Sequence, residues 1–176
     1  MSQWARFYKL RVGDSYPSYC KKRYEPFLEQ INSYDSLSEE GCGIATMTKI
    51  VYQKGKKYTA FDKCSEQLSL ASKNLIGMEV ALKKGNILNH KYKNNPDIIV
   101  SHGVLEHFSD SDIKKIIKRQ LKSCSKLIHY VPLDKWITPS FGDERLLPIS
   151  YWKKIVNPDY IELFNEDKDA VLMWEK

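Results

Sequence analysis

The sequence predicts a doubly wound α/β fold, in which a mainly parallel sheet carries helices on both faces. Strand and helix patterns alternate along most of the 176 residues, and a glycine turn at residues 41–43 separates the first strand pattern from a helix pattern. At the end of the chain, two strand patterns flank the polar run "NEDKD" and indicate an antiparallel hairpin. We expect this hairpin to add an antiparallel edge strand to a sheet of seven strands.

Strands are predicted where short apolar runs are bounded by turn residues. In chain order these runs, some with their flanking turns, span residues 33–40, 57–62, 78–88, 96–104, 125–133, 160–164 and 170–176. The first run is the weakest, because Leu37 is the one clearly apolar residue of "SYDSLSEE". Central strands of parallel sheets are normally apolar. Either this strand is short, or the sheet is more open there.

Helices are predicted where apolar residues recur every three or four positions. These patterns span residues 16–32, 44–55, 65–75, 109–124 and 149–156. Pro26 should kink or restart the first helix, and Gly55 is a plausible C-cap for the second. The helix at 109–124 buries an isoleucine-rich face, and its opposite face is formed by Lys114, Lys115, Lys118 and Lys122.

Composition limits the class of protein. The net charge of +6 permits a nucleic-acid partner, but much of the excess lies in the lysine face of 109–124, which is typical of a solvated surface. The sequence has no run of 18 apolar residues and no apolar leader segment, which favours a cytoplasmic protein without a membrane span. The four cysteines are far apart and are expected to be reduced thiols: Cys20, Cys42, Cys64 and Cys124.

The glycine turn and Asp62 together indicate a nucleoside-bearing cofactor. A glycine turn after a parallel strand lets a ligand approach the backbone, and an acid at the end of the next strand can accept both hydroxyls of a ribose. Asp62 ends the strand pattern "KYTAFD". The third glycine of the dinucleotide pattern is missing, since Gly43 is followed by Ile44 and Ala45, and there is no P-loop motif. These absences favour S-adenosylmethionine over NAD.

Four motifs resemble those of class I S-adenosylmethionine-dependent methyltransferases of the small methyltransferase-domain type. They are "LSEEGCGIA", "YTAFDKC", "KKGNIL" and, most specifically, "PDIIVSHGVLEHFSD". The resemblance runs in register from about Leu37 to Pro132. It implies a Rossmann-like fold and a single methyltransferase domain over residues 1–176, with an N-terminal helical lid at 1–34 and a cofactor-binding core at 35–176.

The resemblance also implies which residues hold the cofactor, S-adenosyl-L-methionine. The resemblance implies that the second motif binds the ribose through Asp62, that the third faces the adenine, and that the fourth lines the methionine side. The corresponding residues are Glu39, Gly41, Cys42, Gly43, Asp62, Lys63, Asn86, Ile87, His102, Gly103 and Val104. Asn86 replaces the usual aspartate, which keeps an acceptor for the adenine amine and loses a charge.

Catalytic candidates follow the fourth motif. His107 is a candidate general base, and Glu106 is a candidate ligand for an acceptor amine. The alternatives are that His107 packs or caps the following helix and that Glu106 favours the positive end of its dipole. No metal site is predicted, since His90 and His129 have no partner at metal-ligand spacing.

Aromatic residues are candidates for the acceptor lid, because aromatic faces attract a sulfonium or a cationic acceptor. They are Trp4, Phe7, Tyr8, Tyr16 and Tyr19 near the start of the chain, and Tyr130 and Trp136 after the fifth strand pattern. The alternative is a helix that packs these rings on the sheet.

The predicted function is methyl transfer to a small-molecule acceptor by in-line displacement. A methyltransferase acting on RNA or protein, a non-catalytic subunit that binds the cofactor, and an NAD-dependent oxidoreductase are the alternatives. The run Ser101-His102-Gly103-Val104 differs from the (Asp/Asn)-Pro-Pro-aromatic motif of base amino-methyltransferases, which disfavours exocyclic base amines. The nucleophilic atom and the oligomeric state stay open at this point.

Overall fold

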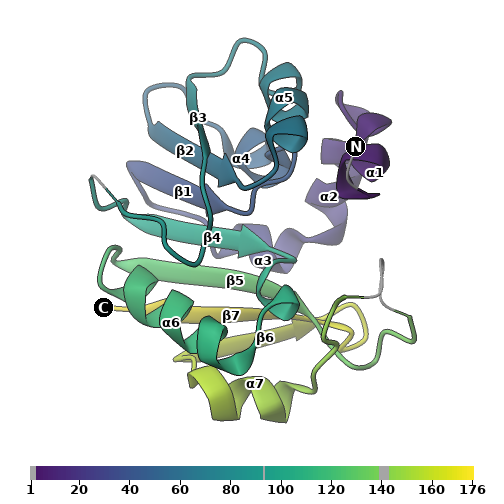
Figure 1. Cartoon of the computed structure of the whole chain (residues 1–176), viewed down its shortest axis with the longest axis vertical. Helices are drawn as coiled ribbons and strands as arrows, with labels where there is room; N and C mark the ends of the chain where they lie inside the picture. Colours follow the sequence, from purple (N-terminus) through teal and green to yellow (C-terminus); the bar gives the residue numbers. More distant parts are fainter. Residues whose placement is uncertain (1–2, 93, 139–142) are drawn as a thin grey trace.

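The computed structural model describes residues 3–92, 94–138 and 143–176, and it confirms the predicted fold class. A seven-stranded sheet has the order β3-β2-β1-β4-β5-β7-β6 (Figure 1). Its strands are β1 (Ser36–Glu40), β2 (Lys57–Asp62), β3 (Val80–Lys84), β4 (Ile98–His102), β5 (Lys126–Pro132), β6 (Tyr160–Phe164) and β7 (Asp169–Glu175). The first five strands pair in parallel, and β7 is antiparallel to both β5 and β6.

The antiparallel strand is therefore an inner strand and not the expected edge strand. The hairpin places β7 between β5 and β6, and β6 forms the edge. The physical reason for this order is that β7 is more apolar than β6. Residues 169–172 of β7 are all buried, whereas β6 leaves Tyr160 and Leu163 exposed. The more apolar strand of the hairpin takes the position with two neighbours.

Helices cover both faces of the sheet. They are α1 (Gln3–Lys9), α2 (Ser15–Arg23), α3 (Glu25–Glu29), α4 (Thr46–Val51), α5 (Ser65–Asn74), the 3-10 helix η1 (Leu105–His107), α6 (Asp110–Leu121) and α7 (Ile149–Val156). In β4, Ile99 faces the cluster that contains α6 and α7, and Ile98 and Val100 face the cluster that contains α2 to α4. This alternation has the period of two that a strand imposes. The sheet thus has a hydrophobic core on each face.

Two helix boundaries test the local signals in the sequence. The predicted helix 16–32 is interrupted at Tyr24, and α3 restarts with Pro26 in its first turn, as expected for proline. The expected C-cap at Gly55 is wrong. Helix α4 ends at Val51, and Gly55 lies in the turn before β2 with a φ of +92°. A glycine with positive φ serves a turn as readily as a helix end.

The polar strand β1 lies at the centre of the sheet, between β2 and β4. Its residues 37–40 are all buried, so the alternative of a more open sheet is wrong. Burying carboxyl groups is costly unless they are hydrogen-bonded. Glu39 accepts bonds from the backbone nitrogen and the hydroxyl of Thr48, at 2.8 and 2.5 Å. Strand β1 can be central because its acids are satisfied internally.

Glu40 belongs to a buried chain of hydrogen bonds that crosses the other face of the sheet. Gln120 of α6 donates to Glu40 at 2.9 Å, and its oxygen lies 3.1 Å from Nε2 of His129. The Nδ1 atom of His129 lies 2.6 Å from the hydroxyl of Ser101, and Tyr92 donates its hydroxyl to Glu40. Burial raises the pKa of Glu40 to about 7 and lowers that of His129 to about 3. The chain joins β1, β4, β5 and α6 through uncharged imidazole and amide groups.

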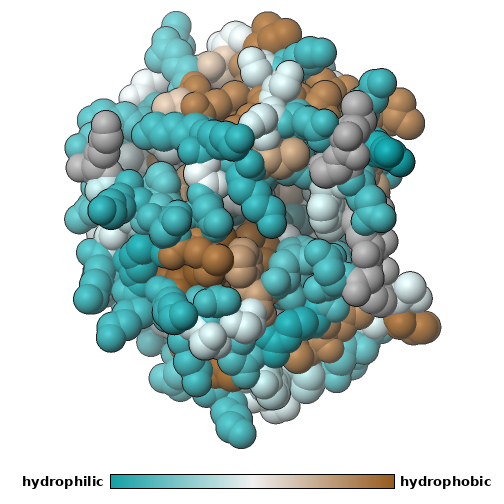
Figure 2. Space-filling view, viewed as in Figure 1, coloured by the Kyte–Doolittle hydropathy of each residue, from teal (hydrophilic) through white to brown (hydrophobic). Residues whose placement is uncertain are grey.

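Most of the face seen in Figure 2 is hydrophilic, and hydrophobic side chains gather in a few patches between the polar ones. The lysine side chains at 114, 115, 118 and 122 are exposed, as predicted. Within residues 3–92, 94–138 and 143–176, no helix combines the length and the apolar character needed to cross a membrane.

The Gln120→Met variant tests the buried chain of hydrogen bonds. It keeps the side-chain length and removes the partners of both Glu40 and His129, so two buried polar groups lose a bond. We expect the free energy of unfolding to fall by about 2–4 kcal/mol, measured by urea denaturation. Lys118→Met, on the exposed face of the same helix, is the matched control and should change it by less than about 0.5 kcal/mol. Equal effects of the two variants would contradict the idea that these buried hydrogen bonds stabilise the fold.

Candidate active site

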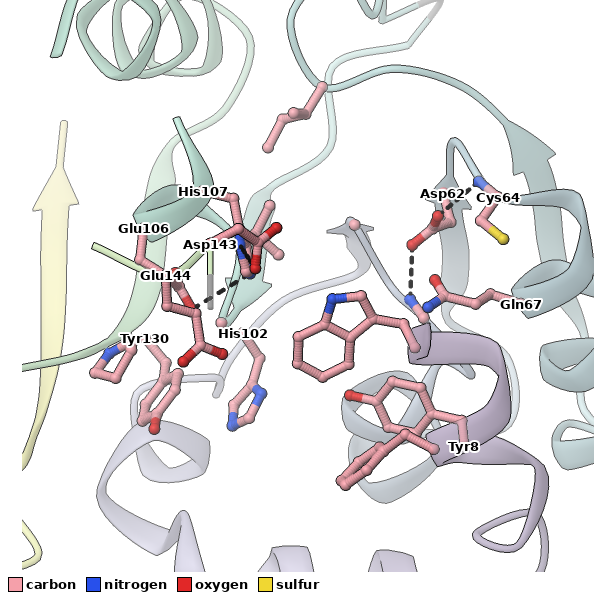
Figure 3. A pocket seen from close by; sticks show the side chains of 18 of the residues that line it. Tyr8, Asp62, Cys64, Gln67, His102, Glu106, His107, Tyr130, Asp143 and Glu144 are labelled. Carbon is pink, nitrogen blue, oxygen red and sulfur yellow. Dashed lines mark hydrogen bonds and ion pairs between the residues drawn. The ribbon is translucent and has the colours of Figure 1, made fainter. Parts of the chain in front are cut away.

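The carboxyl ends of the parallel strands open into one cavity of about 830 Å³. The turn after β1, the end of β2, the segment after β3 and the segment after β4 line one side. Residues of α1 and α2, of the end of β5 and of the segment between β5 and α7 line the rest. Figure 3 shows Asp62 and Gln67 on one side of this cavity and Glu106, His107, Asp143 and Glu144 on the other. The position is the one where ligands bind in doubly wound folds.

The glycine turn has little space beside it. Gly41 has a φ of +65°, and a Cβ atom there would lie 2.7 Å from Cγ2 of Val104. Gly43 has a φ of +55°, and a Cβ atom there would lie 3.4 Å from the ring of Tyr8. Glycine is thus required at 41 by backbone conformation and by the close approach of the segment after β4. Both glycines, which are predicted cofactor residues, line the cavity.

Glu39 and Cys42, two predicted cofactor residues, do not line the cavity. The Glu39 carboxyl points to Thr48 in α4, and burial raises its pKa to about 7. The Cys42 side chain is buried, and burial raises the pKa of its thiol well above the usual value. A thiol in this environment is not a nucleophile. Both residues support the turn from the side of the core. The backbone nitrogen of Cys42 donates a hydrogen bond to the carbonyl of Phe61 at 3.0 Å.

Asp62 is fixed at the end of β2 as a hydrogen-bond acceptor. Its carboxylate accepts bonds from the backbone nitrogens of Gly43 at 3.0 Å and Cys64 at 2.8 Å. With its amide nitrogen turned toward Asp62, Gln67 donates to the two carboxylate oxygens at 3.2 and 3.0 Å. Burial raises the pKa of Asp62, and these backbone bonds and Lys63 oppose the rise. No motif in the sequence marks Gln67 as a site residue, because its contact with Asp62 depends on where α5 packs.

The predicted adenine residues lie together beside Asp62. Lys63, Asn86 and Ile87 all line the cavity, and Ile87 is buried. The Asn86 side-chain oxygen accepts a bond from the backbone nitrogen of Leu88 at 2.9 Å, which orders the loop after β3. This oxygen has a second lone pair that can accept from a ligand.

The residues at the end of β4 line the middle of the cavity. His102 stacks on Tyr130 with ring centroids 4.2 Å apart and an interplanar angle of 10°. Burial lowers the pKa of His102 to about 3, so the ring is neutral. Gly103 has a φ of +66°, and a Cβ atom there would lie 3.3 Å from Oε1 of Glu106. Val104 contacts the glycine turn, which links the first and fourth motifs in space.

Four polar residues meet at the far end of the cavity. Glu106 is 1% exposed, and burial together with Glu144 and Asp143 raises its pKa to about 8. The Nδ1 atom of His107 lies 3.3 Å from Oδ1 of Asp143, and its Nε2 atom lies 4.0 Å from Oε1 of Glu106. The sequence predicts Glu106 and His107 but not Asp143 and Glu144. Those two acids lie far along the chain, in a segment with no spacing that marks it as part of a site.

All seven aromatic lid candidates line the cavity: Trp4, Phe7, Tyr8, Tyr16, Tyr19, Tyr130 and Trp136. Trp4 packs edge-on against His107, with ring centroids 6.0 Å apart. Asp169 fixes the positions of Tyr130 and Trp136, because both side chains donate hydrogen bonds to its Oδ1 atom, at 2.8 and 2.7 Å. The N-terminal aromatics therefore line the cavity and do not pack on the sheet alone.

The fold agrees with the comparisons. The family model for a methyltransferase domain matches residues 39–126, which is half of the chain. The chain therefore belongs to this family. The resemblance to class I S-adenosylmethionine-dependent methyltransferases is confirmed, and S-adenosyl-L-methionine is the cofactor of that class. No curated protein matches the sequence.

Several solved structures share the fold. The PH0226 protein from Pyrococcus horikoshii is 11% identical, with a TM-score of 0.79 over 97% of this chain and 98% of that chain. An S-adenosylmethionine-dependent methyltransferase from Clostridium acetobutylicum is 14% identical, with a TM-score of 0.75 over 98% and 97%. A chain from the complex between the Haloferax volcanii Trm112 methyltransferase activator and a methyltransferase is 7% identical, with a TM-score of 0.76 over 99% and 98%. At these identities the likeness shows the fold alone.

The Gly41→Ala variant tests the close approach of the two motifs. Gly77→Ala is the matched control, because Gly77 also has a positive φ, +82°, but nothing within 4 Å of its Cβ position. We expect Gly41→Ala to lower the free energy of unfolding by about 1–3 kcal/mol more than Gly77→Ala, since it forces Val104 to move. Urea denaturation measures both. The double variant Gly41→Ala/Val104→Ala should recover part of the loss, and no recovery would contradict this explanation.

Proposed function

We propose that the chain is an S-adenosylmethionine-dependent methyltransferase that acts on a small-molecule acceptor. The observation that carries the proposal is a single cavity with two chemically different ends. One end holds a fixed carboxylate beside a glycine turn, and the other holds Glu106 and His107 among aromatic rings. A cofactor at the first end and an acceptor at the second would meet beside His102, Gly103 and Val104.

The residues at the first end fit the cofactor. Asp62 presents oxygens to accept the ribose hydroxyls, and Ile87 and Asn86 offer an apolar surface and an amide for the adenine. Gly41 and Gly43 line the cavity without side chains. The cavity volume of about 830 Å³ falls within the range of about 300–1,000 Å³ that ligand pockets have. S-adenosylmethionine would supply an electrophilic methyl group on its sulfonium sulfur. In this proposal Glu39 and Cys42 support the turn without touching the cofactor.

In this proposal the protein promotes methyl transfer mainly by positioning the two reactants. Holding two reactants in attack geometry can supply roughly 7–11 kcal/mol of barrier reduction. His102 is neutral, so it adds no positive charge beside a sulfonium. The rings of Trp4, Tyr8 and Tyr130 surround the meeting point, where aromatic faces favour a cation and exclude water. The general-base role of His107 stays a prediction.

Two observations favour a small acceptor over RNA or protein. The N-terminal aromatics and the segment before α7 wall the acceptor end, which leaves room for a compact molecule. The lysine face of α6 does not line the cavity, so the positive charge that would attract RNA is not at the site. A non-catalytic subunit that binds the cofactor remains the alternative that the cavity also fits.

Calorimetric titration with S-adenosylmethionine, S-adenosylhomocysteine and NAD tests the cofactor end. We expect micromolar binding of the two adenosyl ligands and none of NAD. Asp62→Asn should weaken adenosyl binding about 10-fold or more, because a charged hydrogen bond is worth about 1.5–3 kcal/mol. Asp134→Asn is the matched control, since Asp134 is exposed and does not line the cavity.

The outcomes separate the alternatives. Binding of NAD without the adenosyl ligands would contradict the proposal and favour an oxidoreductase. Adenosyl binding without methyl transfer to any acceptor in a chemically diverse panel would favour the non-catalytic subunit. Transfer to RNA with steep salt dependence would favour the nucleic-acid alternative.

A further inference from the structure

We propose that Glu106, His107 and Glu144 form a divalent-cation site at the acceptor end of the cavity and that the acceptor presents a hydroxyl oxygen to this cation. The inference rests on the proposed function and specifies its substrate class. The sequence predicts no metal site, and Glu144 lies far from Glu106 and His107 along the chain. The fold brings η1 and the segment before α7 together at the same wall of the cavity.

The three side chains have the spacing of a cation site. One ligand atom from each lies within 4.8 Å of the others. They come from two segments that are tied together, because the backbone nitrogen of Arg145 donates to the carbonyl of Glu106 at 3.0 Å. This bond fixes Glu144 next to η1 and limits how far the three ligands can separate. Figure 3 shows them gathered on the side of the cavity opposite Asp62.

Glu106 supplies an independent observation. Its side chain is 2% exposed and lines the cavity, and its Oε2 atom has no hydrogen-bond partner among the described residues. Buried carboxyl oxygens are normally hydrogen-bonded or bound to a metal. Asp143 and Glu144 add negative charge nearby, and the adjacent guanidinium of Arg145 is already paired with Asp110 at 2.6 Å. A cation bound at Oε2 of Glu106 would give this buried oxygen a partner.

Asp143 lies beside the histidine. Its Oδ1 atom lies 3.3 Å from Nδ1 of His107 without forming a hydrogen bond, and the Nε2 atom of the same ring lies 4.0 Å from Oε1 of Glu106. Trp4 packs against the edge of this ring, which restricts it. The Nδ1 atom is buried and has no hydrogen-bond partner in the part of the chain that the structure describes, so the ring has a nitrogen available to a cation.

The donor set selects the kind of cation and leaves room for the acceptor. One imidazole nitrogen and two carboxylates suit Mn²⁺, Fe²⁺ or Zn²⁺ better than Ca²⁺, which prefers oxygen alone. Three protein ligands leave at least one open position. A hydroxyl oxygen bound there would lose its proton to water more readily. The O–CH₃ bond then forms as the S–CH₃ bond breaks, and the sulfur keeps the electron pair.

Binding of Mn²⁺ alone, followed by electron paramagnetic resonance, tests the site without any assay of activity. We expect one Mn²⁺ per chain with micromolar affinity, displaced by Zn²⁺. Glu106→Gln, His107→Gln and Glu144→Gln should each weaken binding about 10-fold or more. The matched controls are His90→Gln and Glu79→Gln, which lie outside the cavity lining and should leave it unchanged. Thermal melting checks that each variant folds. If Glu106→Gln does not fold, Glu144→Gln keeps the test informative, because Glu144 is only partly buried.

Titration of S-adenosylhomocysteine into the same samples separates this proposal from the previous one. Adenosyl binding without Mn²⁺ or Zn²⁺ binding up to millimolar concentration would overturn the cation site and leave the cofactor site standing. Cation binding that all three variants retain would also overturn it. Absence of adenosyl binding would instead defeat the proposed function.

Discussion

The hydrogen bond from the backbone of Gly43 to the carboxylate of Asp62 is the constraint on which the site depends. At 3.0 Å it joins the turn after β1 to the end of β2, and a second bond links the backbone of Cys42 to the carbonyl of Phe61. These bonds hold the turn open toward the cavity and the acid in its place. A ligand that binds both elements meets a surface that is already ordered, which lowers the entropic cost of binding.

Strand β1 supports this constraint from within the core. Glu39 reaches α4 on one face of the sheet, and Glu40 reaches α6 on the other through Gln120. Adjacent residues on a strand point to opposite faces, so a pair of acids can anchor both helical layers. Hydrogen bonds satisfy both carboxyl groups, which explains how a polar strand occupies the centre of a parallel sheet. The same burial keeps Glu39 out of the cavity lining.

Close packing between distant motifs gives the cavity its two ends. Val104 contacts Gly41, so the segment after β4 is held against the glycine turn. His102 stacks on Tyr130, and Tyr130 in turn bonds to Asp169 at the start of β7. The C-terminal hairpin thus fixes an aromatic wall of the cavity although it contributes no motif of its own. Strands far apart in sequence cooperate because their ends meet at one edge of the sheet.

The sequence by itself determined the order of the elements, the glycine turn, Asp62 and the segment with His102, Glu106 and His107. Those signals are local, since strand and helix periodicity and turn chemistry depend on neighbouring residues. Only the tertiary structure decided that Glu39 and Cys42 face the core, that β7 is an inner strand, and that Asp143 and Glu144 join Glu106 and His107. Each of these three features depends on which distant surfaces pack together, and the spacing of residues along the chain does not reveal that packing.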